Sequence, residues 1–269
     1  MSFFQDKVVV ITGGSDGIGK ALIEGLIPQG AKVATCGRSH DKLYKLQMEY
    51  SNVLLHAVAC DVSIEEECRR FIESTIETFG RIDILINNAG ISMRALFAEC
   101  DTKVTKKVME INFLGAVYCT KYALPSILGN KGTIVGVSST AGYRGLPGRS
   151  AYSASKFALQ GWLESLRTEL LYSGVNVMWV CPGFTASNIR LAALDSHGEA
   201  RGETVLNEAG LMTAADCARH ILKAIERRKR TLILTFLGKV TVLINKMAPS
   251  LADRLTYKHY YNKKGEFVK

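Results

Sequence analysis

The sequence lacks the cysteine and histidine patterns that mark disulfide-bonded and metal-binding proteins. Its seven cysteines are an odd number and include no C-x-x-C pair, and its five histidines are scattered without metal-ligand spacing. These absences exclude a disulfide framework and a zinc site, so we expect no bound metal. They favour reduced, mostly buried thiols in a reducing compartment.

Long apolar runs and the features of a signal peptide are scarce as well. No stretch of about 18 apolar residues appears, so we expect no segment that spans a bilayer. The start of the chain has neither the basic segment nor the apolar core of a signal peptide. We therefore expect a cytoplasmic protein, which leaves open a peripheral contact with a membrane surface.

What is present fits one folded domain. The chain has 269 residues, of which 47% are apolar, enough for an α/β domain with a sizeable core. The net charge of +9 raises the possibility of an anionic partner. The basic residues are dispersed until Arg227-Arg228-Lys229-Arg230 and the C-terminal tail, so we do not expect binding to nucleic acid.

Tyr152 and Lys156 form the first pair with a chemical meaning. They open an apolar-periodic run that predicts a helix, and residues four apart share one helix face. A tyrosine with a pKa of ~10 is a poor acid or base at neutral pH, but a nearby cation lowers that pKa. The pair can thus act as a general acid/base. The alternative is an ordinary amphipathic helix with a solvated lysine.

A glycine-rich turn follows the first apolar run. The run Lys7–Thr12 predicts a buried parallel strand, and the turn Gly13-Gly14-Ser15-Asp16-Gly17-Ile18-Gly19 leads into a predicted helix. Such a turn lets the backbone approach a pyrophosphate at the helix N-terminus. The glycine spacing is G-x-x-x-G-x-G, and by itself it is a weak sign of a dinucleotide site.

Two further motifs complete the pattern. Asn87-Asn88-Ala89-Gly90 follows a fourth apolar run, and the run Gly132–Val137 ends in Ser138-Ser139, with Ser139 13 residues before Tyr152. In this order the motifs resemble those of the short-chain dehydrogenases/reductases, from about Lys7 to about Phe236. The chain looks most similar to the subgroup of 11-beta-hydroxysteroid dehydrogenase-like and related membrane-associated reductases.

The resemblance implies a fold. Strands that alternate with helices predict a parallel sheet with right-handed crossovers. The family adds a single Rossmann-type, doubly wound α/β domain over residues 1–236, with seven strands in the order 3-2-1-4-5-6-7 and helices on both faces. We expect a long helix over residues 103–128 and a last strand over residues 231–236. We also expect a mobile substrate lid over residues 188–211.

The resemblance also implies a reaction, the interconversion of a ketone and a secondary alcohol. Tyr152 is then the general acid/base, and Lys156 lowers its pKa and binds the nicotinamide ribose. Ser139 hydrogen-bonds the substrate oxygen, with Ser138 as the alternative donor, and Asn112 completes a proton relay. The alternatives are a 3-oxoacyl thioester reductase and, in a different class, a non-catalytic NADP-binding regulator on the same fold.

Arg38 predicts which nicotinamide cofactor binds. The second strand ends without the carboxylate that an NAD site usually carries, and the Arg38 fork can bind a 2′-phosphate. We therefore expect NADP(H), with a solvated arginine as the alternative. By resemblance the cofactor-binding residues are Gly13, Ser15, Asp16, Gly17, Ile18, Gly19, Arg38, Ser39, Asp61, Val62, Asn88, Ala89, Gly90, Tyr152, Lys156, Pro182, Gly183, Thr185 and Ser187.

The tail over residues 237–269 outruns the common family core. Its apolar residues lie at helical spacing, interrupted by Pro249, and basic residues flank them. This amphipathic extension packs on its own domain or a partner subunit, or lies in a membrane interface beside a lipophilic substrate entrance. By resemblance we also expect a homodimer or homotetramer.

Overall fold

The computed structural model describes residues 1–50, 54–183, 185, 189–202 and 211–268. Its sheet has seven parallel strands in the order β3-β2-β1-β4-β5-β6-β7, which confirms the expected order. The strands are β1 (Val8–Thr12), β2 (Lys32–Gly37), β3 (Leu55–Ala59), β4 (Ile84–Asn87), β5 (Thr133–Val137), β6 (Asn176–Cys181) and β7 (Thr231–Ile233).

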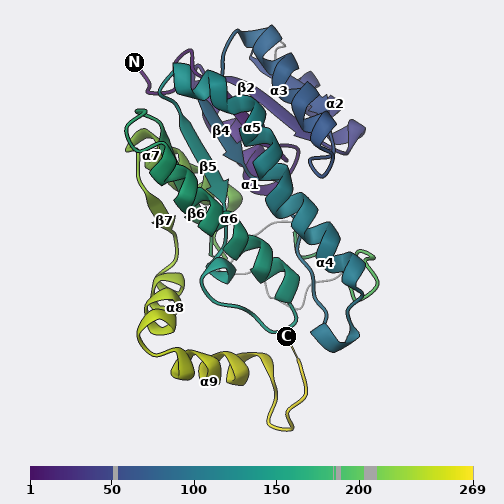
Figure 1. The fold of residues 1–269 in the computed structure, drawn as a ribbon. Coiled ribbons are helices and arrows are strands. Elements are labelled where there is room, and N and C mark those ends of the chain that lie inside the picture. The colour runs from purple at the N-terminus through teal and green to yellow at the C-terminus, as the bar shows by residue number, and fades with distance from the viewer. Residues whose placement is uncertain (51–53, 184, 186–188, 203–210, 269) are drawn as a thin grey trace.

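Helices cover both faces of the sheet (Figure 1). They are α1 (Gly17–Leu26), α2 (His40–Glu49), α3 (Glu65–Phe79), α4 (Thr102–Met109), α5 (Gly115–Gly129), α6 (Ser150–Glu169), α7 (Ala214–Glu226), α8 (Phe236–Met247) and α9 (Pro249–Tyr260). Within the described part of the chain, no helix is long and apolar enough to cross a membrane.

Alternate side chains of the strands enter two separate cores. Val9 and Ile11 of β1 pack with α1 and α7 on one face, whereas Val10 packs with α3, α5 and α6 on the other. Because both faces are covered, the strands are apolar without alternation. Six of the seven cysteines are buried in this interior, and all seven are free thiols.

The strand order reverses between β1 and β4. β1 pairs with β2 on one side and with β4 on the other. The strands that follow β1 are therefore added toward one edge of the sheet, and those that follow β4 toward the opposite edge. Open α/β sheets bind ligands in the crevice outside the carboxyl ends of such strands. The glycine turn after β1 and the Asn88-Ala89-Gly90 segment after β4 both lie there.

The end of the sheet differs from the sequence prediction. We expected the last strand to reach Phe236, but β7 ends at Ile233 and α8 begins at Phe236. The Thr235 side chain accepts a hydrogen bond from the Gly238 N–H, so this residue caps the helix and ends the extended backbone. Pro249 separates α8 from α9 as predicted and occupies the first turn of α9.

The long helix predicted over residues 103–128 is present but interrupted. A π-helical turn over Glu110–Leu114 joins α4 to α5. Single π-helical turns inside α-helices frequently occur at functional sites. The turn contains Asn112, whose contacts are described below.

Candidate active site

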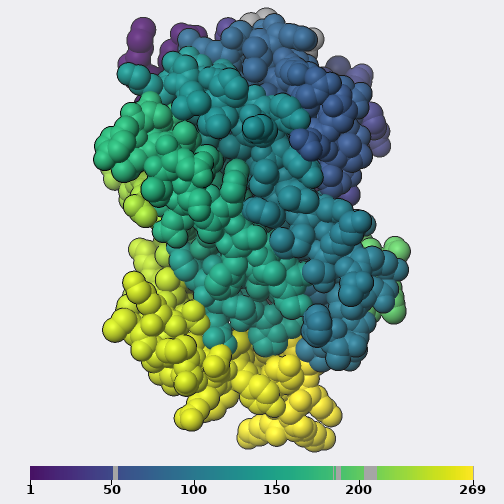
Figure 2. Space-filling view, in the orientation of Figure 1, coloured from purple at the N-terminus to yellow at the C-terminus, as the bar shows by residue number. Residues whose placement is uncertain are grey.

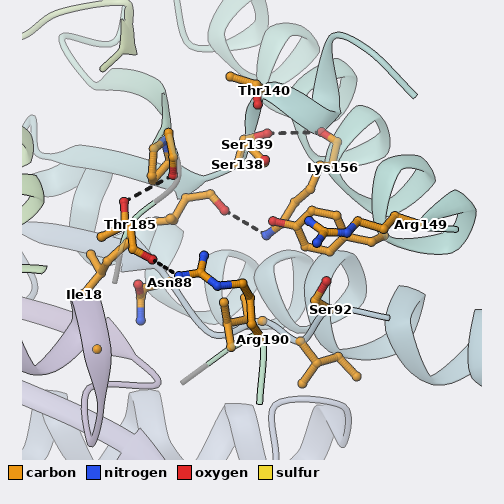
Figure 3. Close-up of a pocket in the computed structure, with 18 of the residues that line it drawn as sticks. Ile18, Asn88, Ser92, Ser138, Ser139, Thr140, Arg149, Lys156, Thr185 and Arg190 are labelled. Atoms are coloured by element: carbon orange, nitrogen blue, oxygen red, sulfur yellow. Dashed lines mark hydrogen bonds between the residues drawn. The ribbon is translucent and has the colours of Figure 1, made fainter. Parts of the chain in front are cut away.

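One cavity of about 700 Å³ joins most of the residues predicted for the site. Its wall contains the glycine turn after β1, the segment after β4, Ser139 after β5, and Tyr152 and Lys156 of α6. In Figure 3, Ser139 and Lys156 lie on the opposite side of this space from Ile18 and Asn88. Segments far apart in the sequence therefore form a single elongated site.

The glycine turn is held by the segment after β4. The Asn88 side chain donates to the carbonyl oxygens of Thr12 and Gly13 at 2.9 and 3.1 Å. The backbone N–H groups of Asn88 and Ala89 both donate to the Thr12 hydroxyl at 3.0 Å. These four bonds hold the glycine turn against the segment after β4. The two sequence motifs therefore form one connected wall of the site.

Two of the glycines are required by geometry. Gly13 has a φ of +69°, which non-glycine residues rarely adopt. A Cβ at Gly19 would lie 2.3 Å from the Gly13 carbonyl oxygen and 2.7 Å from the Asn88 amide nitrogen. Gly19 is absent from the described cavity wall, so it supports the turn from behind instead of lining the space.

Cations line the far end of the cavity. Arg38 and Ser39 follow β2 there, and both are exposed. The Ser39 hydroxyl caps α2 by accepting from the Lys42 N–H, and the Lys42 ammonium pairs with Asp16. Sequence reasoning missed Lys42, although its position one turn into the helix after Arg38-Ser39 could have suggested it.

The residues after β3 form the neighbouring wall. Asp61 and Val62 both line the cavity. The Asp61 carboxylate accepts from the Ser63 backbone and hydroxyl at 3.0 and 2.7 Å, and the Asp61 N–H donates to Glu67. Asp61 therefore has a well-defined orientation beside the site.

Ser139 and Tyr152 both line the cavity. Tyr152 is 9% exposed, and the Ser139 hydroxyl lies close enough to its phenol to lower the pKa of that phenol. Ser138 is engaged elsewhere: it donates to the Lys156 carbonyl oxygen at 3.4 Å and accepts from Gln160 at 2.7 Å. Of the two serines, Ser139 is thus the one whose hydroxyl acts on the tyrosine.

The charges around Tyr152 differ from the sequence expectation. We expected Lys156 to lower the Tyr152 pKa, but burial raises this pKa, and the partial lowering comes from Ser139 and Arg149. The Lys156 ammonium donates to the Val137 carbonyl oxygen at 2.9 Å and lies 5.7 Å from the Tyr152 ring centroid. Burial lowers the pKa of Lys156 to about 8.

Burial of Lys156 predicts a pH-dependent stability. Between pH 8 and the ordinary lysine value of 10.5, the unfolded chain binds a proton that the folded protein does not. The wild type should therefore gain stability with rising pH across this window. Lys156→Met removes this ionisable group. We expect urea unfolding to show that the free energy of unfolding of Lys156→Met, minus that of the wild type, is greatest below pH 8 and declines toward pH 10.5. The exposed Lys121→Met is the control, and a difference for Lys156→Met that does not change with pH would contradict the assignment.

Asn112 stands behind the cavity wall and is 2% exposed. Its side chain accepts from the Ile91 N–H at 2.8 Å and donates to the Ile91 carbonyl oxygen at 2.9 Å. It also donates to the Ser155 hydroxyl at 3.0 Å. A Cβ at Gly90 would lie 3.2 Å from the Asn112 oxygen and 3.4 Å from the Lys156 ammonium. Asn112 thus locks the segment after β4 close to Lys156.

The segment after β6 contributes a further wall. Pro182, Gly183 and Thr185 line the cavity. The Thr185 hydroxyl donates to the Gly183 carbonyl oxygen at 3.2 Å, and Arg190 donates to the Thr185 carbonyl oxygen at 3.1 Å. Ser187 and part of the predicted lid, residues 188 and 203–210, lie outside the described residues. The described part, over residues 189–202, packs on the segment after β4 through Leu194.

The C-terminal helices α8 and α9 line one side of the same cavity. Figure 2 shows this C-terminal segment at one end of the molecule. Arg144 joins the two helices to the loop after Ser139, since its guanidinium donates to Asn245 of α8 at 3.1 Å and to Asp253 of α9 at 2.6 Å. Asn245 returns a bond to the Tyr143 carbonyl oxygen at 2.8 Å. Sequence reasoning placed the tail near the substrate entrance but did not identify Arg144.

Comparison with known proteins gives the class. The pattern of the short chain dehydrogenase family matches residues 7–197. Dehydrogenase/reductase SDR family member 7B of Xenopus laevis is 35% identical over 260 residues, covering 93% of this chain and 80% of that protein. 11-beta-hydroxysteroid dehydrogenase 1A of Arabidopsis thaliana is 35% identical over 267 residues, covering 93% of this chain and 75% of that protein.

A solved structure agrees. A short-chain dehydrogenase from Streptomyces avermitilis superposes with a TM-score of 0.80 at 27% identity, covering 94% of this chain and 97% of that one. The chain belongs to the short-chain dehydrogenases/reductases and is related to their 11-beta-hydroxysteroid dehydrogenase-like members. By this membership it is an oxidoreductase.

Proposed function

We propose that the protein interconverts a ketone and a secondary alcohol with NADP(H). The observation that carries this proposal is the Ser139–Tyr152 pair, placed in the same cavity as a glycine turn built for a pyrophosphate. The bound nicotinamide would supply or accept the hydride. The glycine turn, Arg38 and the segment after β6 would hold this cofactor.

The chain's own residues handle the proton. In the reduction, the Tyr152 phenol donates its proton to the carbonyl oxygen as negative charge develops there. The raised pKa of this buried phenol keeps it protonated before the reaction. The Ser139 hydroxyl hydrogen-bonds the same oxygen and stabilises its charge. Lys156 would hold the nicotinamide ribose. Asn112 would keep the backbone beside Lys156 in place, so that a proton relay can restore the proton that Tyr152 has given up.

A screen of NADPH consumption tests the reaction and its alternatives. The purified protein would be assayed with steroids, long-chain ketones, retinals and 3-oxoacyl thioesters. Turnover with a ketone supports the proposal, whereas exclusive turnover of thioesters would favour a 3-oxoacyl thioester reductase. NADPH binding without turnover of any class would favour a non-catalytic regulator.

Arg38 should set the preference for NADPH over NADH. Its guanidinium lines the cavity just after β2, where no carboxylate stands to accept from a ribose hydroxyl. Loss of one charge-assisted hydrogen bond costs about 1.5–3 kcal/mol, so Arg38→Ala should lower the NADPH-to-NADH affinity ratio on the order of 10- to 100-fold. The ratio is measured by fluorescence titration of both cofactors, with Arg219→Ala as an exposed control. An unchanged ratio would mean that Arg38 is only a solvated residue.

The C-terminal extension would bring a lipophilic substrate from a membrane surface. Phe236, Leu243 and Met247 of α8 are 83%, 61% and 74% exposed, and basic residues of the tail accompany them. Such a surface suits an anionic lipid interface. We expect the protein to co-sediment with anionic liposomes at low salt, and Leu243→Asp to weaken this more than Leu171→Asp, which changes an exposed leucine in the turn after α6. Wild-type protein that stays in the supernatant would contradict the proposal.

We further propose a homodimer or homotetramer that pairs through α4, α5 and α6. Exposed apolar side chains on these helices, Leu128 and Phe157, support this pairing. Light scattering at micromolar concentration should report a dimer or larger, and a monomer would contradict it.

A further inference from the structure

Arg149 places a positive charge in the cavity wall without a counter-charge. It immediately precedes α6, and Figure 3 shows its side chain among the residues of the cavity wall. Tyr152 and Tyr260 line the same cavity. The guanidinium is near enough to both phenols to lower the pKa of each. In the described structure it forms no ion pair and no side-chain hydrogen bond. The adjoining helix N-terminus is itself partly positive, so the helix cannot neutralise it.

The contrast with Arg144 shows that this arrangement is specific to Arg149. Arg144 also lines the cavity, but its guanidinium is matched by Asn245 and by the carboxylate of Asp253. Among the described residues of the cavity wall, the carboxylates are Asp16 and Asp61, at the end formed by the glycine turn and β3. Asp16 is paired with Lys42. The wall near Tyr152 therefore presents positive charge without an acid beside it.

Apolar side chains form much of the wall beside Arg149. Leu146 follows Ser139 in the chain, and α8 and α9 add Val240, Ile244, Ala252 and Leu255, together with the polar Thr241, Thr256 and His259. A half-buried cation next to such a surface is poorly solvated, and an anion from a ligand would offset that cost. The planar guanidinium is suited to the two oxygens of a carboxylate or phosphate.

We propose that the substrate is an amphipathic anion that carries a carbonyl group. Its carbonyl oxygen lies at Ser139 and Tyr152, its aliphatic part lies against α8 and α9, and its anionic oxygen group binds the Arg149 guanidinium. This inference rests on the proposed carbonyl–alcohol reaction, and it adds the chemical class of the substrate. Arg149 then determines specificity and takes no part in proton transfer.

Equilibrium binding tests the inference without requiring turnover. A long-chain fatty acid, its methyl ester and an alkyl phosphate of the same chain length would be titrated into wild type and Arg149→Gln by calorimetry. We expect the wild type to bind at least one anion more tightly than the ester, on the order of 10- to 100-fold. Arg149→Gln should lose this preference, and Arg149→Lys should restore part of it. The anion that loses more affinity identifies the group.

Arg144→Gln is the matched control, because it removes a cavity guanidinium that already has a partner. It should keep the ratio of anion to ester affinity. Equal affinities in the wild type, a preference that survives in Arg149→Gln, or an equal loss in Arg144→Gln would each overturn the proposal.

Turnover separates this inference from the proposed function. Medium-chain oxo-acids and their methyl esters would be assayed with NADPH, and Arg149→Gln should lower kcat/KM for each acid more than for its ester. If both are reduced and their ratio does not respond to Arg149→Gln, the reaction stands and the inference fails. If neither is reduced, the binding ratio alone decides the inference.

Discussion

Replacing Tyr152 by phenylalanine should remove most turnover while the fold and cofactor binding persist. The change deletes one hydroxyl and leaves the ring, which packs with Met93, Val108 and Ala151. A general acid of this kind contributes on the order of 10²- to 10⁴-fold to the rate, and we expect kcat to fall by that factor. Stopped-flow or steady-state NADPH oxidation measures it.

Tyr143→Phe is the matched control for this experiment. Tyr143 is half-buried, and its hydroxyl accepts a hydrogen bond from the Trp179 indole at 2.9 Å, but it lies outside the described cavity wall. The control also loses a phenolic hydroxyl, together with its hydrogen bond to Trp179. Its turnover should stay within a few-fold of wild type. Near-normal turnover of Tyr152→Phe would contradict the assigned role.

Replacing Asn112 by alanine should cost the protein much of its stability. The change removes the Asn112 partner from the N–H and carbonyl of half-buried Ile91 and from the hydroxyl of fully buried Ser155. Each buried unsatisfied polar group costs about 1–3 kcal/mol, so we expect the free energy of unfolding to fall by roughly 2–5 kcal/mol. Urea unfolding measures this change. Turnover should fall too, because the segment after β4 is no longer held beside Lys156.

Asn130→Ala serves as the comparison for Asn112→Ala. The Asn130 amide also donates to backbone carbonyl oxygens, those of Ile82 and Ser126, but this residue is exposed at the end of α5. Water replaces its lost bonds, so its effect should stay below about 1 kcal/mol. If the free energy of unfolding falls by the same small amount in both variants, Asn112 does not hold the segment after β4 in place.

The sheet and the placement of the motifs were predictable because they depend on local patterns. Continuous apolar runs such as Val8–Thr12 must be covered on both faces, and right-handed crossovers then leave few strand orders. Every motif that follows a parallel strand reaches the same edge of the sheet. Arg38 and Ser139 accordingly share one cavity, although about a hundred residues separate them in the sequence.

Other features depend on contacts that the sequence does not display. The π-helical turn at Asn112 forms where its side chain pairs with Ile91, 21 residues earlier. The predicted length of β7 was wrong because Thr235 caps α8, although threonine is a residue type that favours β-strands. The Tyr152 pKa was expected to fall, but burial, a property of the folded chain, raises it. Arg149 could not be told from a solvated arginine until its position in the cavity was known.

Hydride transfer itself tests the central claim most directly. The protein would be incubated with a carbonyl substrate and NADPH in which both hydrogens on the reactive carbon of the nicotinamide are deuterium, and the product would be analysed by mass spectrometry. We predict an alcohol with deuterium on its carbinol carbon, formed in equal amount to NADP⁺, and none from Tyr152→Phe within the same time. An alcohol without deuterium, or no alcohol from any carbonyl class while NADPH binds, would contradict the proposed oxidoreductase.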